Sequence, residues 1–148
     1  MKKIIVLGCN FDQIPYLKIL KKDSYFIIGF DKNNNCPGKK FCDKFYSISY
    51  INHEKIIAKL KKEKINNKTL LFSAASQNSI ITLSKIAKRF KIEFTSEKKL
   101  KICLDKNKLT NSFNRFNINT PKSKKIYKKD QYLKILINLN INKNYYLK

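Results

Sequence analysis

The chain is poor in the residues on which several kinds of site depend. It has three glycines and no G-x-G-x-x-G run, so a dinucleotide pyrophosphate site would lack its glycine-rich turn. Its single histidine, His53, is accompanied by no G-x-S-x-G nucleophile elbow, and we interpret it as a surface residue. The four cysteines form no C-x-x-C pair, which indicates reduced thiols and argues against a disulfide framework. We therefore expect no metal site built from these residues.

Long hydrophobic runs are also missing. No apolar stretch approaches the roughly 18 to 20 residues that span a bilayer. The segment at residues 2–7 is too short for the core of a signal peptide, and no small-residue cleavage site follows it. We expect a cytoplasmic protein that has no membrane partner.

Arginine is scarce, because Arg89 and Arg115 are the only arginines among 33 basic residues. The formal net charge is nevertheless +23, which taken alone suggests a nucleic-acid partner. Specific readout favours the planar fork of arginine, however, and the lysines here are spread over every segment. The parallel excess of Lys, Asn and Ile is typical of an AT-rich genome. We expect weak, salt-sensitive association with nucleic acids and no sequence-specific complex.

Residues 1–95 show a regular alternation of strand and helix patterns. Runs of β-branched and aliphatic residues predict strands at 3–7, 25–30, 44–48, 69–72 and 92–95. Helical spacing of apolar residues predicts helices that begin near Asp12, Asn52 and Ser76, each a residue type that caps helices. This alternation predicts a Rossmann-like α/β fold with a parallel sheet and helices on both faces.

The order of elements changes after residue 95. Helices are predicted at 97–104 and 105–117, after which Thr120 and Pro121 interrupt the chain. A strand at 124–127, a helix at 131–139 and a strand from Tyr145 onward follow. Because the chain ends inside that last strand, we expect it to belong to a longer protein. We divide it into domains at 1–104 and 105–148.

Polar residues gather where the predicted strands end. The turn with Gly8 and Asn10 leads into a helix N-terminus, which favours an anion or polar ligand but is equally typical of an ordinary strand-to-helix turn. Asp31 ends the second strand, where it either reads a ribose hydroxyl or, without the glycines, caps a turn. Ser73 and Ser76 follow the fourth strand and suit substrate binding, although a plain helix cap is the simpler role for Ser76.

Several short motifs occur in a recognisable order. They are Ile5-Val6-Leu7-Gly8, Asp12-Gln13-Ile14-Pro15, Gly29-Phe30-Asp31, Cys36-Pro37-Gly38, Cys42-Asp43-Lys44-Phe45, Asp105-Lys106 and Phe116-Asn117-Ile118-Asn119-Thr120-Pro121. In this order they resemble the N-terminal part of the ATP-grasp ligases, above all the small-molecule carboxylate-amine ligases. The resemblance covers essentially the whole chain. It implies a Rossmann-like pre-ATP-grasp domain at 1–104 and the first elements of an α+β ATP-grasp domain at 105–148.

The resemblance also implies a reaction and a set of site residues. The family uses ATP and Mg²⁺ to activate a carboxylate as an acyl phosphate, which an amine or another nucleophile attacks. Lys106 and Lys148 match the family's nucleotide-binding lysines. The expected substrate-binding residues are Gly8, Asn10, Asp12, Gln13, Asp31, Ser73 and Ser76. The family's glycine-rich lid and Mg²⁺ ligands would follow Lys148, so we expect no catalytic residue in this chain and no turnover by the chain alone.

Other functions remain open on the sequence. The first alternative is a non-catalytic Rossmann-like module that binds a small metabolite or a nucleotide, and the second is a basic protein associated with nucleic acid. A homodimer is also compatible with the sequence. A glycine-rich lid followed by acidic metal ligands in the downstream reading frame would favour the ligase over both alternatives.

Overall fold

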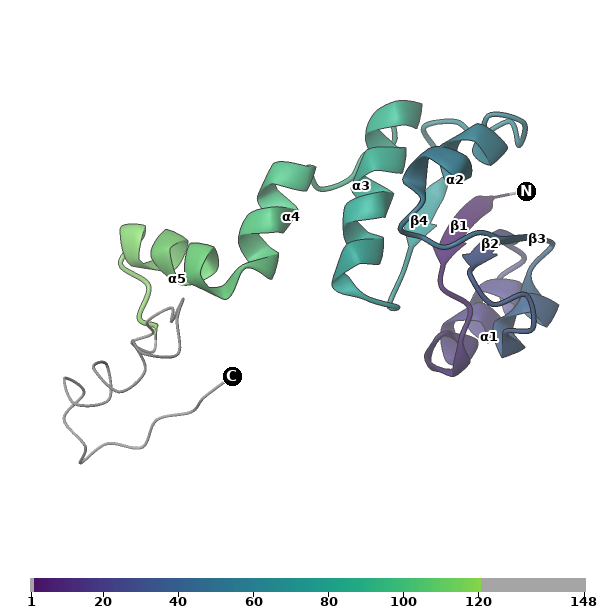
Figure 1. Ribbon diagram of the computed structural model, residues 1–148, viewed down its shortest axis with the longest axis horizontal. Helices are drawn as coiled ribbons and strands as arrows, with labels where there is room; N and C mark the ends of the chain where they lie inside the picture. The colour runs from purple at the N-terminus through teal and green to yellow at the C-terminus, as the bar shows by residue number, and fades with distance from the viewer. Residues whose placement is uncertain (1, 121–148) are drawn as a thin grey trace. The chain divides into compact units, whose positions relative to one another are not determined.

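The computed structural model describes residues 2–120, which Figure 1 traces as a coloured ribbon. The chain falls into two compact units, Met1–Leu104 and Asp105–Lys148, and each is described by itself. The strand predicted at 124–127, the helix at 131–139 and the strand from Tyr145 lie outside the described residues. Within residues 2–120, no helix is both long enough and apolar enough to cross a membrane.

The first unit is built on a parallel sheet. In the described part of the chain its strands are β1 (Lys3–Leu7), β2 (Phe26–Asp31), β3 (Lys44–Ser47) and β4 (Leu70–Phe72), arranged in the order β3-β2-β1-β4. β1 is central and pairs in parallel with β2 and β4, so that Val6 is in register with both Gly29 and Phe72. β1 and β2 are almost wholly buried, which explains their unbroken aliphatic runs.

Helices cover both faces of the sheet. The helices of this unit are η1 (Phe11–Gln13), α1 (Ile14–Lys22), η2 (Pro37–Phe41), α2 (His53–Leu60), α3 (Gln77–Phe90) and α4 (Glu97–Leu104), where η marks a 3-10 helix. Figure 1 shows α1 on one side of the strands and α2 with α3 on the other. The predicted α/β class, with a parallel sheet between two helical layers, is confirmed.

The buried core is correspondingly divided in two. Successive residues of a strand point to opposite faces. Ile5 and Leu7 of β1 therefore join a buried cluster with Ile56 of α2 and Leu83 of α3. On the other face, Ile4, Val6 and Leu17 belong to a second cluster, which Phe41 and Cys42 border. The sheet is thus held from both sides by aliphatic packing, and its ends are left to polar groups.

The segment predicted as a fifth strand, 92–95, is not a strand. α3 ends at Phe90, and its C-cap residue Lys91 adopts the left-handed conformation with φ 53°. Ile92 N then donates to Ala87 O at 2.9 Å, and Ser84 Oγ donates to Thr95 O at 2.9 Å. These bonds hold the segment alongside α3. Its polar groups bond to residues of α3 and not to a neighbouring strand.

The expected cap of the first helix is also wrong. Asp12 lies inside η1, and α1 begins only at Ile14, with Gln13 in the cap position and no side-chain hydrogen bond to cap it. Pro15 does fall in the first turn, where its missing N–H costs little. Asn52 likewise precedes α2 without a capping hydrogen bond from its side chain.

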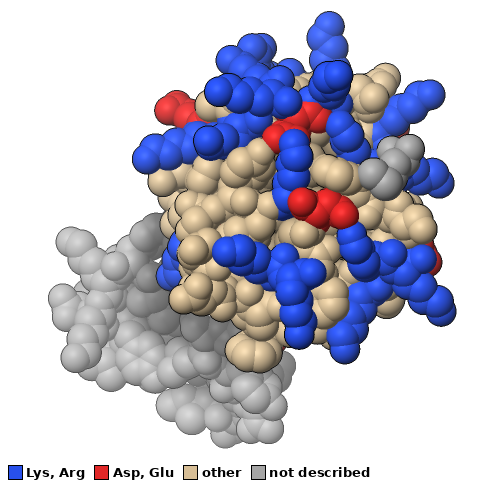
Figure 2. All heavy atoms as spheres, turned by 90° about the vertical axis from the view of Figure 1, so that its right-hand side faces the viewer, with Lys and Arg blue, Asp and Glu red and all other residues tan. Residues whose placement is uncertain are grey.

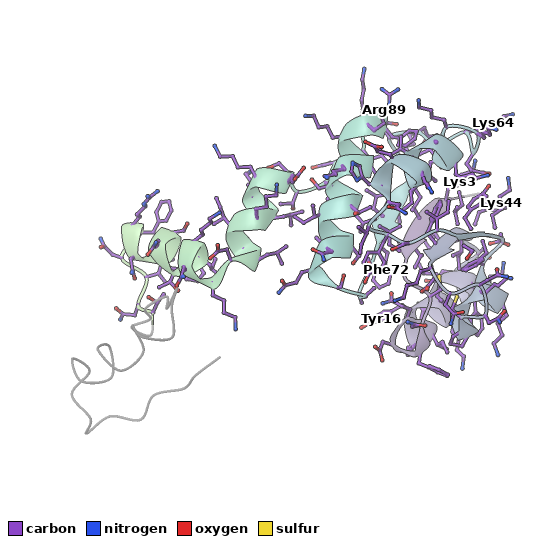
Figure 3. All side chains as sticks on the ribbon, in the orientation of Figure 1. Lys3, Tyr16, Lys44, Lys64, Phe72 and Arg89 are labelled. Carbon is purple, nitrogen blue, oxygen red and sulfur yellow. The ribbon has the colours of Figure 1, made fainter. Side chains whose placement is uncertain are left out.

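A closed polar cluster lies at the amino-terminal ends of the strands. Glu63 is only 7% exposed, and its carboxylate accepts a hydrogen bond from Lys44 Nζ at 2.6 Å and another from the hydroxyl of Tyr46. Lys3 Nζ donates to the backbone carbonyl of Glu63 at 2.6 Å. Figure 3 labels Lys3, Lys44 and Lys64 on this side, and Figure 2 shows lysines scattered over the same face with acidic groups between them.

This cluster shifts the pKa values of its acids. Burial alone would raise the pKa of Glu63, but the hydrogen bonds from Lys44 and Tyr46 outweigh it and lower that pKa below its usual 4.5. The hydrogen bond to Glu63 raises the pKa of Tyr46 to about 12. The carboxylate is therefore charged and compensated at neutral pH.

The described part of the second unit contains α5 (Lys106–Arg115). Asp105 is its N-cap, and its carboxylate accepts from Asn107 N at 3.1 Å and Lys108 N at 3.2 Å. The helix ends two residues earlier than the predicted 117, because the chain turns at Phe116 and Asn117 has a positive φ of 55°.

Candidate functional site

Two loops meet where β1 and β4 end, and Gly8 makes their close approach possible. Gly8 follows β1 with a φ of 86°, a conformation that favours glycine. A Cβ atom at this position would lie 2.5 Å from Ala75 Cβ in the loop after β4. Both the backbone angle and the contact therefore require glycine. The turn after β1 and the loop after β4 form one continuous edge.

Gln13 links these two loops from the inside. Its side chain is 1% exposed, and its Oε1 atom accepts a hydrogen bond from Ala74 N at 3.3 Å. Among residues 2–120, no buried side-chain nitrogen or oxygen atom lacks a hydrogen-bond partner. The buried Gln13 side chain is therefore a structural link between the turn after β1 and the loop after β4.

Asp31 ties the same turn to the loop after β2. It is 5% exposed, and its Oδ2 atom accepts from Cys9 N at 2.8 Å. Its Oδ1 atom accepts from Asn33 N at 2.9 Å, which closes the turn that follows β2. Both carboxylate oxygens accept hydrogen bonds from backbone N–H groups. Of the two roles expected for Asp31, the geometry therefore favours turn capping over binding of a ribose hydroxyl.

The serines after β4 hold the loop and the start of α3. Ser73 Oγ donates to Leu7 O at 2.6 Å and lies 2.7 Å from Ser79 Oγ. Ser76 caps α3 in a capping box, because its side chain accepts from Ser79 N and the Ser79 side chain accepts from Ser76 N. Ser79 was missed from the sequence, although the Ser76-x-x-Ser79 spacing is close to the S-x-x-E capping pattern.

The two helical starts at this edge differ in their capping. At the start of α3 the serine pair satisfies the N–H groups of Ser76 and Ser79, whereas neither η1 nor α1 has a side-chain cap. The first N–H groups of η1 have no partner inside this short 3-10 helix, so its uncapped start offers hydrogen-bond donors. Asn10 and Asp12 are exposed beside this start, and Phe11 is 75% exposed. The open part of the edge is therefore the turn at 8–13.

The packing of α1 keeps this turn in place. Tyr16, in the first turn of α1, packs on Phe72 at the end of β4, with ring centroids 5.1 Å apart (Figure 3). Gly38 N donates to Cys9 O at 2.8 Å and fixes the turn from the side of η2. The turn is thus anchored on three sides while its outer surface stays accessible.

The structure brings four of the expected site residues together in one network and leaves two others exposed beside it. Gly8, Gln13, Asp31 and Ser73 lie in one network of hydrogen bonds and close approaches. The side chains of Asn10 and Asp12 are exposed at its rim. Among residues 2–120 there is no cluster of three or more His, Cys, Asp or Glu side chains that could hold a metal ion.

The expected nucleotide-binding lysines lie in the second unit. Lys106 is exposed at the first position of α5, next to the capping Asp105. An ammonium group at a helix start is free to reach a phosphate, and it stays a prediction here. Lys148 lies outside the described residues.

The fold of this chain is similar to that of several solved synthetases and ligases. The chain is similar in structure to phosphoribosylglycinamide synthetase from Anaerococcus prevotii, with 20% identity over 94% of this chain and 35% of that one and a TM-score of 0.71. It is similar to N5-carboxyaminoimidazole synthetase from Staphylococcus aureus complexed with ADP, with 13% identity over 93% of this chain and 35% of that one and a TM-score of 0.72.

A third similar structure is L-amino acid ligase from Bacillus licheniformis, with 11% identity over 94% of this chain and 42% of that one and a TM-score of 0.64. The resemblance predicted from the motifs is thus confirmed at the level of the fold. The chain spans between a third and a half of the length of these structures. No protein-family profile matches the chain, and no curated protein matches it in sequence.

Proposed function

We propose that this chain is the N-terminal part of an ATP-dependent ligase and that the turn at 8–13 binds one of the ligase's small-molecule substrates. The observation that carries the proposal is the open half of the strand edge, where the start of η1 has no side-chain cap and the side chains of Asn10 and Asp12 are exposed. The fold that the chain shares with a phosphoribosylglycinamide synthetase and an L-amino acid ligase supports it.

In the proposed reaction a carboxylate is activated and a carbon-nitrogen bond is formed. ATP with Mg²⁺ would supply the phosphoryl group that turns the carboxylate into an acyl phosphate, which a nucleophile such as an amine then attacks. The part of this chain described here would hold the substrate in place for that attack. Positioning of this kind contributes several kcal/mol to a bimolecular reaction, typically about 7 or more where the fit is good.

The residues of the turn have separate parts in this proposal. The first N–H groups of η1 would donate to an anionic or carbonyl oxygen of the substrate, and Asp12 would pair with an amine. Gln13, Asp31 and Ser73 would act as positioning residues, because their polar atoms hold the backbone of the two loops. The rim position of Asn10 suits a further hydrogen bond to the substrate.

Lys106 fits the ATP part of the proposal. It would offset phosphate charge from the start of α5, as an exposed ammonium group can. Residues 2–120 hold no carboxylate cluster suited to Mg²⁺, so its ligands would have to come from outside this range. The proposal also takes the protein to be cytoplasmic, with small molecules as its partners.

The substrate site is tested by titrating the isotope-labelled chain and following its amide resonances. The probes are glycine, other L-amino acids and ribose 5-phosphate, added one at a time. We expect at least one probe to shift the amides of 9–13 and 74–76 and to leave those around Glu63 unchanged. Shifts centred on the amino-terminal ends of the strands, or no shift with any probe, would contradict the proposed site.

The role of Asp12 is tested by substitution. Asp12→Asn should weaken binding of an amine-bearing probe about fivefold, the effect of losing about 1 kcal/mol from an exposed ion pair. Asp23→Asn is the matched control, because Asp23 is an exposed aspartate at the opposite end of α1. Equal losses in both variants would indicate a general charge effect and remove Asp12 from the site.

The nucleotide part is tested separately in a protein that includes a complete nucleotide-binding domain. Lys106→Ala should weaken ATP binding in a calorimetric titration while leaving Tm nearly unchanged, because an exposed lysine contributes little to packing. Lys98→Ala, an exposed lysine of α4, is the control. Unchanged ATP affinity in Lys106→Ala would remove this lysine from the nucleotide site.

A further inference from the structure

Two cysteine side chains meet beneath the turn that follows β1. The Sγ atoms of Cys9 and Cys42 are 3.9 Å apart, although 33 positions separate the residues in sequence. Cys9 is fully buried directly after Gly8, and Cys42 directly follows η2 and is half-buried. The pair therefore connects the candidate substrate turn with the loop between β2 and β3.

Gly29 of β2 makes room for the two sulfur atoms. A Cβ atom at this position would lie 2.4 Å from Cys42 Sγ and 3.0 Å from Cys9 Sγ. Any side chain there would occupy the space that the thiols share. The sulfurs are thus brought together over a glycine in the middle of a buried strand.

The two thiols are not equivalent. The hydrogen bond with the Cys9 thiol lowers the pKa of Cys42, against the opposing effects of burial and of the Asp43 carboxylate, and the Lys21 ammonium lowers it further. The same contact, together with burial, raises the pKa of Cys9. Cys42 is therefore the more accessible thiol of the pair and the one whose pKa is lowered, and Cys9 is its buried neighbour.

We propose that Cys42 is an oxidation site for hydroperoxides and that Cys9 resolves the product to a Cys9–Cys42 disulfide. In the first step the Cys42 thiolate attacks one oxygen of hydrogen peroxide, the O–O bond breaks, and the departing hydroxide takes a proton to become water. Cys42 is then a sulfenic acid. The peroxide is the oxidant, and the sulfur supplies the electron pair.

In the second step Cys9 Sγ attacks the Cys42 sulfur. The S–O bond breaks, the hydroxyl group leaves with the Cys9 proton as a second water, and the S–S bond forms. The Sγ atoms must close from 3.9 Å to about 2.05 Å. One peroxide and two thiols thus give one disulfide and two waters.

The other cysteines provide internal controls. Cys36 is 3% exposed, and burial raises its pKa, so it should stay reduced. Cys103 is exposed on α4 and measures the reactivity of an ordinary surface thiol. A specific site at Cys42 must therefore react faster than the more exposed Cys103.

The test treats the reduced 148-residue chain with increasing hydrogen peroxide, blocks remaining thiols with iodoacetamide and identifies peptides by mass spectrometry. We expect an intramolecular Cys9–Cys42 disulfide that forms before Cys103 is modified and is reversed by dithiothreitol. In Cys9→Ala the sulfenic acid should persist at Cys42 and be trapped by dimedone, and in Cys103→Ser the disulfide should form as in the wild type.

A wild-type measurement covers the case in which Cys9→Ala does not fold. Dimedone present during oxidation should capture Cys42 at the expense of the disulfide. Modification of Cys103 before Cys42, a disulfide that includes Cys36, a disulfide between chains, or no disulfide at peroxide levels that oxidise Cys103 would each overturn the proposal.

Discussion

The two ends of the same parallel sheet are finished in opposite ways. At the amino-terminal end, Glu63 is buried and its carboxylate is satisfied by Lys44 and Tyr46, with Lys3 beside it. At the carboxyl end, polar groups also link the loops, but the start of η1 has no side-chain cap and its rim is exposed. At the amino-terminal end the Glu63 carboxylate has hydrogen-bond partners within the cluster. At the carboxyl end the inner polar groups have partners, while the start of η1 has no side-chain cap.

This difference separates stability from binding. A polar cluster in which each member has a partner strengthens the fold, and it offers nothing to a ligand because every new contact must break an old one. A helix start with unpaired N–H groups contributes less to stability but can accept a ligand without that exchange. The sheet therefore places its structural polar network and its candidate binding edge at opposite ends.

The largest loss of stability is expected from Gly8→Ala. The substitution puts a Cβ at a φ of 86° and 2.5 Å from Ala75 Cβ, so backbone strain and overpacking add to about 2–4 kcal/mol of unfolding free energy. Urea unfolding measures it. The double variant Gly8→Ala/Ala75→Gly should recover the packing part and retain the strain. No recovery would mean that the contact with Ala75 is unimportant.

A smaller loss is expected from Glu63→Gln at the closed end, about 1–3 kcal/mol at pH 7, because charged hydrogen bonds to Lys44 and Tyr46 are weakened. Since the pKa of Glu63 is lowered by folding, its contribution is present above its usual value of 4.5 and is lost as the pH falls through the folded value. The variant should therefore lose less stability on acidification than the wild type.

Unfolding free energies measured between pH 7 and acid check this expectation. Glu93→Gln is the control, because Glu93 is exposed in the loop after α3. Parallel acid profiles for Glu63→Gln and the wild type would show that the cluster does not hold the carboxylate in its charged form. The candidate binding edge should be unaffected by the substitution in either case.

The smallest pair of effects compares the two helical starts directly. Ser76→Ala removes the cap of α3 and should cost about 1 kcal/mol. Asn10→Ala, at the cap position of η1, should cost almost nothing, because no side-chain hydrogen bond caps that helix. Thermal unfolding of the two variants side by side measures the difference. Similar losses would remove the contrast on which the candidate site depends.

The parts of the fold that local patterns specify were predictable from the sequence. β1 and β2 follow from their unbroken buried runs, and α3 follows from its apolar spacing and the capping serine at 76. The segment 92–95 was misjudged because Ile92 and Phe94 fit a short strand equally well. Its true path depends on the hydrogen bond from Ser84 of α3 to Thr95 O. That bond is a contact with a helix side chain, which the local strand pattern does not contain.

The candidate site rests on the general rule that ligands bind at the carboxyl ends of parallel strands, and its detail was not predictable. The burial of Gln13 and its bond to Ala74, 61 positions away, are tertiary contacts that no local pattern contains. Similarly, the uncapped start of η1 depends on a 3-10 turn that replaced the expected cap at Asp12. Lys106 is placed only on its own helix, so its role as a nucleotide ligand stays a prediction.

The central position of β1 has a consequence for the order of folding. Ile5 pairs with Ile28 of β2 and also with Leu71 of β4, which is much further along the chain. Closing the longer loop costs more chain entropy, so β4 should dock after β1 and β2 have paired. The contacts of Gly8 and Gln13 with the loop after β4 are completed only by that late step. A nascent chain would therefore acquire its candidate binding edge last, when the sheet itself is finished.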